Sequence, residues 1–160
     1  GRGTTFNIFL PRVDEEPISE STQKASPTVA TSKQTILVVE DEESLLKSTC
    51  SLLRAVGYEV LEALGGSEAL RISQVRNRDI QVVLTDVVMP GMDGVELVQH
   101  LIAQRPSLKV IYMSGYTGQS AGRSAAFSPD ALFLMKPFTR EELVRKIQDA
   151  LQAQTVGATA

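Results

Sequence analysis

The sequence predicts an α/β domain built on a five-stranded parallel sheet that is covered by helices on both faces. Between residues 35 and 154, short apolar runs alternate five times with longer segments whose apolar residues recur at helical spacing. The apolar runs are mostly continuous, which is typical of strands that are buried on both faces. Such β-α alternation indicates a parallel sheet in which helices make the connections.

Composition narrows the class of protein. The chain has 160 residues, of which 42% are hydrophobic, and this fits one globular domain with some additional chain. Acidic residues outnumber basic ones by 19 to 16, so we expect neither nucleic acid nor an anionic membrane surface as a partner. The single cysteine, Cys50, excludes an internal disulfide, fits a reducing compartment and is expected to be at least half-buried in a helix.

The sequence carries no recognisable targeting segment. It contains no signal peptide and no apolar run of about 18 residues, the length that a membrane-spanning helix needs. We therefore expect a cytoplasmic piece without direct membrane contact, although its parent protein could be anchored in a membrane. Because the chain does not begin with Met, we expect it to be cut from something longer.

Each predicted strand is followed by a predicted helix. The strands are expected at residues 36–39, 58–61, 80–84, 108–113 and 131–135. The helices are expected from the acids at 40–43 to Gly57, and at 67–75, 95–104, 117–127 and 139–151. The expected inner faces are Leu45, Thr49, Leu52, Leu53 and Val56 on the first helix, and Leu143, Val144, Ile147 and Leu151 on the last. Asp93 with Glu96, and Thr139 with Glu142, have the spacing of capping boxes.

The two ends of the chain differ from the domain between them. Residues 1–11 predict a tight glycine turn followed by a lone β-segment. Residues 12–34 are rich in Ser, Thr and Pro and lack apolar periodicity, which is typical of a flexible linker. Residues 155–160 are expected to be a disordered tail.

Polar side chains gather where four of the predicted strands end. Glu40 and Asp41 follow the first strand, Asp86 the third, Ser114 the fourth and Lys136 the fifth. A parallel sheet brings these ends to one edge, where open α/β sheets hold their ligands. Three carboxylates at one edge would repel one another, and Mg²⁺ is a cation that suits such oxygen ligands.

This set of residues suits the transfer of a phosphoryl group. An ionised Asp86 can attack phosphorus and form an aspartyl phosphate, while Lys136 and the hydroxyl of Ser114 can each bind a phosphoryl oxygen. Taken singly, each residue has an ordinary explanation as a helix cap, a turn or a surface lysine. Their convergence on one sheet edge favours the chemical interpretation. His100 has no such support and is expected to be structural or solvated.

Residues 35–154 resemble the receiver domain of two-component response regulators. The resemblance rests on Glu40-Asp41, the stretch DVVMPGMDG that begins at Asp86, Ser114-Gly115 and Lys136-Pro137-Phe138. It implies a flavodoxin-like fold with strand order 2-1-3-4-5. It also implies that Asp86 is the phospho-acceptor. Mg²⁺ would bind Asp41 and Asp86 directly, Glu40 through water, and the backbone carbonyl of Val88.

The same resemblance implies roles for further residues. Ser114 and Lys136 match the hydroxyl and the lysine that sense the phosphoryl group, and Phe133 matches the aromatic residue of the switch. The Lys136-Pro137 bond is expected to be cis. Val88 and Tyr116 would flank the path of the water that hydrolyses the acyl phosphate. Residues 117–126 have low helix propensity and are expected to form the most mobile helix, the one that changes most on activation.

A second resemblance concerns the N-terminus. Residues 1–11, GRGTTFNIFLP, resemble the last glycine box and final strand of a histidine-kinase ATP-binding domain. Together the two resemblances point to the C-terminal receiver of a hybrid sensor histidine kinase, although the chain itself lacks the catalytic core. Its partner would be a phosphohistidine on a kinase core or on a histidine phosphotransfer protein.

Two other functions remain open from the sequence. The first is a receiver-like binding module that turns over no phosphate, against which the complete set of acids, Ser114 and Lys136 argues. The second is a phosphatase that forms an aspartyl phosphate. Such enzymes usually carry a second Asp two residues after the nucleophile, where this chain has Val88.

Overall fold

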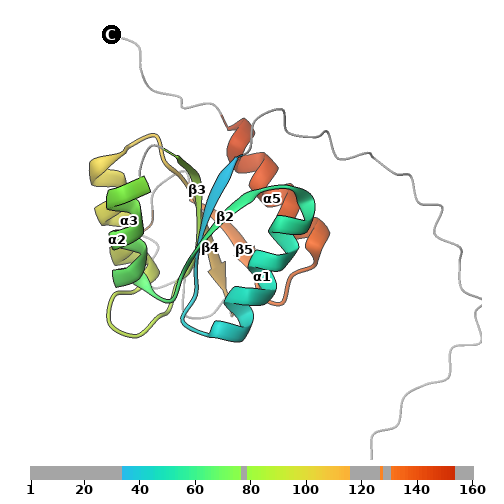
Figure 1. Ribbon diagram of the computed structural model, residues 1–160, viewed down its shortest axis with the longest axis horizontal. Coiled ribbons are helices and arrows are strands. Elements are labelled where there is room, and N and C mark those ends of the chain that lie inside the picture. The colour runs from blue at the N-terminus through green and yellow to red at the C-terminus, as the bar shows by residue number, and fades with distance from the viewer. Residues whose placement is uncertain (1–33, 77–78, 116–126, 128–130, 154–160) are drawn as a thin grey trace, which may run out of the picture.

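The computed structural model describes residues 34–76, 79–115, 127 and 131–153 (Figure 1). Its elements are β1 Thr35–Val39, α1 Glu43–Val56, β2 Glu59–Ala63, α2 Gly66–Arg76, β3 Ile80–Asp86, α3 Gly94–Gln104, β4 Lys109–Ser114, β5 Leu132–Met135 and α5 Arg140–Gln152. The predicted segments 1–11, 12–34 and 155–160 lie outside the described residues, apart from Gln34. The predicted helix 117–127 also lies outside them, apart from Phe127.

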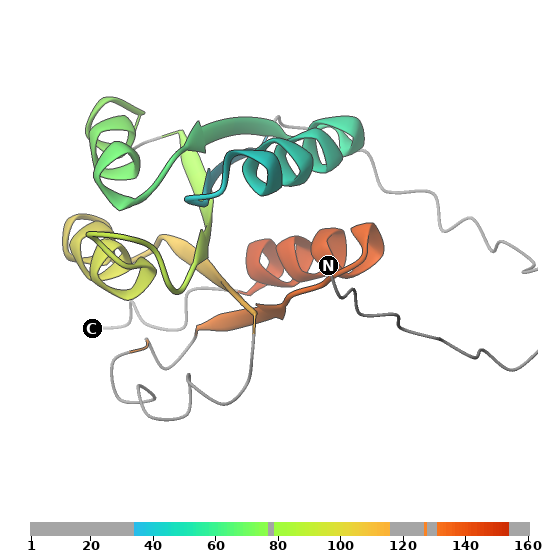
Figure 2. The same ribbon diagram turned by 90° about the horizontal axis from the view of Figure 1, so that it is seen from below.

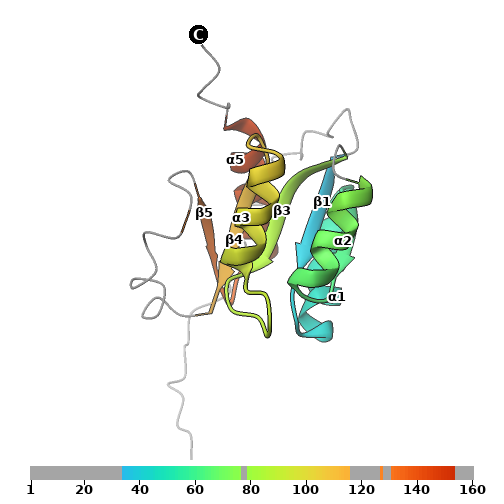
Figure 3. The ribbon, with the colours of Figure 1, turned by 90° about the vertical axis from the view of Figure 1, so that its left-hand side faces the viewer.

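The strands form one parallel sheet in the order β2-β1-β3-β4-β5, which confirms the predicted flavodoxin-like topology. Helices α1 and α5 cover one face, and α2 and α3 cover the other (Figures 2 and 3). Successive residues of β1 therefore enter different cores. Ile36 and Val38 pack with α1 and α5, whereas Leu37 and Val39 pack with α2 and α3. This alternation is why the strand is apolar at every position.

The inner face of α1 is rotated relative to the prediction. Its buried residues are Leu46, Thr49, Cys50 and Leu53, whereas Leu45 is 42% exposed. Thr49 and Leu53 were assigned correctly, and Leu45 was wrong. Cys50 lies at the middle of the buried stripe, one turn after Leu46, and this places Leu45 on the flank of the helix. Burial also raises the pKa of the Cys50 thiol to about 12.

Helix α5 follows its predicted pattern more closely. Leu143 and Ile147 are fully buried as expected, and Ala150 completes the buried stripe. The predicted Val144 and Leu151 are only partly buried. Among the described residues, no helix has the length and apolar character required to cross a membrane.

Local signals in the sequence fix where the helices begin and end. Gly57 ends α1 in the left-handed conformation, with a φ of 106°. The Asp93 side chain accepts hydrogen bonds from the amides of Val95 and Glu96 at the start of α3. Thr139 forms the predicted capping box with Glu142 at the start of α5. The Lys136-Pro137 bond that precedes this cap is cis, as predicted.

Paired substitutions on α1 test the observed face. We expect Leu46→Ala to lower the free energy of unfolding by about 2–4 kcal/mol, because it leaves a cavity in the core. Leu45→Ala, one position away, should lower it by less than about 1 kcal/mol. Urea denaturation of the two variants measures the difference, and equal losses would mean that the buried face has been assigned wrongly.

Candidate functional site

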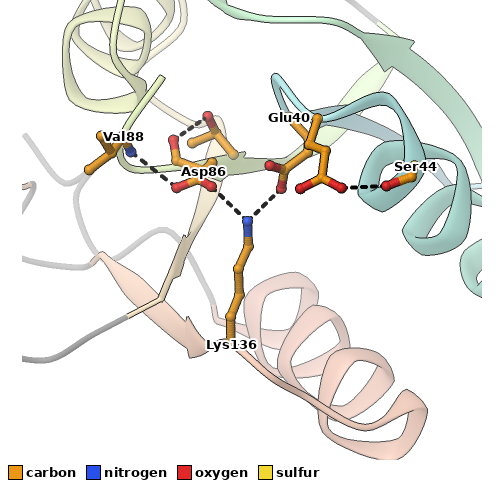
Figure 4. Close-up of polar contacts among 7 residues, drawn as sticks. Glu40, Ser44, Asp86, Val88 and Lys136 are labelled. Atoms are coloured by element: carbon orange, nitrogen blue, oxygen red, sulfur yellow. Dashed lines mark hydrogen bonds and ion pairs between the residues drawn. The ribbon is translucent and has the colours of Figure 1, made fainter. Parts of the chain in front are cut away.

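Three elements bring charged side chains together at the carboxyl edge of the sheet. Glu40 follows β1, Asp86 ends β3, and Lys136 follows β5. The Nζ atom of Lys136 lies 2.6 Å from Oε2 of Glu40 and 2.6 Å from Oδ2 of Asp86, so the lysine bridges the two carboxylates (Figure 4). These residues are far apart in the sequence, and the strand order of the sheet is what places them side by side.

Asp41 adds a third carboxylate to this group. One carboxylate oxygen from each of Glu40, Asp41 and Asp86 lies within 4.8 Å of the others, and we call these three residues the acid cluster. Glu40 is only 3% exposed, while Asp41 faces solvent and Asp86 is intermediate. The cluster is therefore closed on the side of Glu40 and open on the side of Asp41. Three oxygen ligands at this spacing fit a hard divalent cation such as Mg²⁺.

Lys136 supplies the positive charge that faces the acid cluster. Burial raises the pKa of Glu40, and the hydrogen bond from Lys136 opposes that rise without cancelling it. For Lys136 itself, burial alone would lower the pKa, but its hydrogen bonds to Asp86 and Glu40 outweigh burial and raise it. The lysine therefore stays charged at neutral pH and holds the two acids together.

The backbone around Asp86 also contributes to the site. Oδ1 of Asp86 accepts a hydrogen bond of 3.0 Å from the amide of Val88, so each carboxylate oxygen has its own donor (Figure 4). The Asp86 carbonyl accepts a 2.9 Å hydrogen bond from the hydroxyl of Thr85. Gly94, the first residue of α3, lies against the same carbonyl. The sequence reasoning missed Thr85 and Gly94. The signal in the sequence that could have identified Thr85 is that it is a polar residue within an otherwise apolar run.

Ser114 and Lys136 lie on neighbouring segments. The amide of Lys136 donates a 2.7 Å hydrogen bond to the Ser114 carbonyl, which extends the pairing of β4 and β5 up to the site. Ser114 is buried at the end of β4, and its neighbour Met113 is in register with Asp86. The hydroxyl-bearing residue is thus placed at the same edge as the acid cluster. Tyr116 lies outside the described residues, and His100 is exposed on α3, away from this edge.

Phe133 belongs to a group of three aromatic rings. It stacks on Tyr112 at 5.6 Å between ring centroids and meets Phe127 edge-on at 5.0 Å. Tyr112 and Phe127 also meet edge-on, at 4.9 Å. Tyr112 is buried, whereas Phe133 is 37% exposed. The sequence indicated Phe133, but it gave no sign of the two partners because the ring contacts depend on the tertiary fold and not on a local pattern.

Comparison with known proteins agrees with this geometry. Residues 36–148 match the family described as the response regulator receiver domain. The chain belongs to the response regulator receiver family. Receivers of this family act in two-component signal transduction, where they work with histidine kinases or phosphotransfer proteins and generally bind Mg²⁺ through acidic residues. The acid cluster of this receiver has the residue types that such binding requires.

Individual relatives support the assignment. The sensor kinase CckA of Brucella abortus is 36% identical over 161 residues, which cover 96% of this chain and 17% of the kinase. The response regulator receiver protein CpdR of the same species is 30% identical over 118 residues, which cover 74% of this chain and 97% of CpdR. The crystal structure of the receiver domain of the hybrid histidine kinase CckA is 36% identical. It covers 74% of this chain and 99% of its own, with a TM-score of 0.64.

The charge balance of the receiver site predicts how stability responds to loss of the lysine. Without Mg²⁺, we expect Lys136→Ala to lower the free energy of unfolding by about 1–3 kcal/mol, because the buried Glu40 loses its cation. Excess Mg²⁺ should recover part of this loss by supplying another cation. Urea denaturation with EDTA or with Mg²⁺ measures both effects.

Lys47→Ala serves as the matched control. Lys47 forms an ion pair with Glu43 on the exposed surface of α1, and solvent screens such pairs so that they contribute little to stability. We expect this variant to unfold almost as the parent does, with or without Mg²⁺. Equal losses for the two lysine variants in EDTA would contradict the role given to Lys136.

Proposed function

We propose that Asp86 accepts a phosphoryl group from a phosphohistidine. The observation that carries this proposal is the position of its carboxylate, which lies at the carboxyl edge of the sheet beside two further acids and 2.6 Å from Lys136. Membership of the receiver family gives the reaction class. In this reaction a carboxylate oxygen of Asp86 attacks phosphorus, the P–N bond breaks, and its electron pair returns to the donor imidazole.

The surrounding residues have separate tasks in this reaction. Asp41 and Asp86 would hold Mg²⁺ directly, with Glu40 acting through water and the carbonyl of Val88 as a further ligand. The ion, when bound, neutralises charge on the phosphoryl oxygens. Lys136 pairs with one of these oxygens, and the Ser114 hydroxyl donates to another. The fit to Mg²⁺ is supported by the acid cluster, in which three carboxylate oxygens lie within 4.8 Å of one another.

Phosphorylation would change the conformation by a population shift. Ser114 moves toward the phosphoryl group, and Phe133 turns into the space that it leaves. The observed contacts support this switch, because Phe133 is partly exposed and its ring packs against the rings of Tyr112 and Phe127. The segment 117–126, which we expect to change most, lies outside the described residues.

We further propose that the chain is the C-terminal part of a hybrid sensor histidine kinase in the cytoplasm. The alignment with CckA supports this, because 96% of 160 residues is about 154, so at most about six residues are left out. The similarity therefore extends over most of residues 1–33, which precede the receiver. The phosphohistidine donor would then lie on the kinase core of the same protein or on a histidine phosphotransfer protein.

Replacement of the acceptor tests the proposed reaction. Asp86→Asn should abolish labelling by a phosphohistidine donor or by a small phosphodonor, because the amide is a far weaker nucleophile and metal ligand. Asp79→Asn is the matched control, since Asp79 is an exposed acid just before the start of the same strand. It should be labelled as the parent is. Undiminished labelling of the Asp86 variant would refute the assignment.

The lifetime of the acyl phosphate should depend on Val88. This side chain is 67% exposed beside Asp86 and cannot orient an attacking water by hydrogen bonding. We expect Val88→Asn to speed loss of phosphate by up to about tenfold, which corresponds to about 1.4 kcal/mol of barrier. Tyr116→Ala should also speed it if the ring covers the phosphoryl group. The measurement is the dephosphorylation rate of each variant in excess Mg²⁺. If both variants lose phosphate at the rate of the parent, the side chains do not shield the acyl phosphate.

A further inference from the structure

The geometry points to Thr85 as a positioning residue for the acceptor: together with Gly94 it forms a seat for the backbone carbonyl of Asp86, and this seat orients the Asp86 carboxylate. This inference rests on the proposed role of Asp86. We call Thr85 and Gly94 the carbonyl seat. The Thr85 hydroxyl bonds to the backbone of Asp86, and Gly94 has no side chain, so their effect on the reaction is exerted through that backbone.

Thr85 is a polar residue that is fully buried in the sheet. Its exposure is 0%, and it lies in the central strand β3, in register with Val39 on one side and Tyr112 on the other. Burying a hydroxyl is unfavourable unless it is hydrogen-bonded, and valine would fill the same volume without that cost. The Thr85 hydroxyl meets this requirement by donating to the Asp86 carbonyl at 2.9 Å. The bond ties the residue before the acceptor to the peptide that follows it.

Gly94 closes the seat from the side of α3. A Cβ atom on Gly94 would lie 1.9 Å from the Asp86 carbonyl oxygen and 3.1 Å from Oγ1 of Thr85. No side chain can occupy that space without moving the backbone. The amide of Gly94 also donates a 3.1 Å hydrogen bond to the carbonyl of Val87. The end of the loop is thereby bonded to the residue that follows Asp86. Helix α3 therefore begins in direct contact with the acceptor's peptide group.

The seat controls atoms that the reaction uses. Rotation of the peptide after Asp86 would shift the amide of Val88, which donates to Oδ1, and would also turn the bond that carries the carboxylate. Oδ2 would then leave its 2.6 Å contact with Lys136. Both oxygens of the acceptor thus depend on one backbone orientation. A small misplacement of a reacting group is costly because the near-attack geometry is narrow.

Thr85→Val tests this inference, because it keeps the shape of the side chain and replaces the hydroxyl by a methyl group that cannot donate. With saturating Mg²⁺ and saturating phosphoramidate, we expect the phosphorylation rate per folded molecule to fall about three- to tenfold, the size expected for loss of one neutral hydrogen bond. Thr85→Ser keeps the hydroxyl and should stay within about twofold of the parent. A role in packing alone would instead lower the folded fraction and leave the rate per folded molecule unchanged.

A second measurement tests whether the carbonyl seat orients the Asp86 carboxylate, and it needs no phosphorylation. The amide resonance of Val88 reports its hydrogen bond to Oδ1, and we expect it to shift in Thr85→Val and to return in Thr85→Ser. Thr35→Val is the matched control. It removes another buried strand threonine, at the opposite end of the sheet, and should change neither the rate nor this resonance. Gly94→Ala should shift the same resonance further, because its Cβ has no room.

The outcomes separate this inference from the proposed function. If Thr85→Val keeps both the phosphorylation rate and the Val88 amide resonance of the parent, the inference is wrong. It is also wrong if Thr85→Ser fails to restore that rate and that resonance. If the parent takes up no phosphate on Asp86, the proposed function fails, whereas the Val88 resonance still decides whether Thr85 orients the Asp86 carboxylate.

Discussion

The ion-pair bridge from Lys136 to Glu40 and Asp86 is the interaction on which the site depends. Glu40 is almost fully buried, and a buried carboxylate without a cation would be strongly unfavourable. Lys136 removes that penalty and at the same time holds Asp86 at the edge of the sheet. The bridge joins the segments that follow β1 and β5 to the end of β3, so it depends on the pairing of β1, β3, β4 and β5 in their observed order. The site is therefore complete only when these four strands have paired.

Charge and geometry are supplied by different parts of the receiver. Lys136 and the acid cluster provide opposite charges that a divalent cation or a phosphoryl group can rearrange. The carbonyl seat of Thr85 and Gly94 provides an orientation that involves neutral groups only. The contacts that orient the backbone of Asp86 are therefore separate from the charged groups around its carboxylate. This separation suits a site that must pass between an unmodified and a phosphorylated state.

Much of this could be predicted from the sequence, and the exceptions have physical reasons. The buried strands are apolar at nearly every position, so the sheet and the residues at its carboxyl edge were predictable. Leu45 and Leu46 are adjacent and equally apolar, and only contact with the sheet shows which one is buried. Thr85 was missed because threonine is common in strands and its partner is a backbone atom. Tyr112 and Phe127 were missed because their ring contacts are formed by the tertiary fold and leave no pattern in the sequence.

The outer strand β2 has a further consequence for how copies of the protein meet in concentrated solution. It is an edge of the described sheet, and edge strands can recruit a strand from another molecule. Two ion pairs flank it, Arg54 with Glu62 and Arg76 with Glu59. An incoming strand would meet these charged side chains beside the edge, and charged side chains oppose such pairing. β2 is thereby guarded against edge-to-edge aggregation, and this protection comes from the same side chains that fasten the strand to α1 and α2.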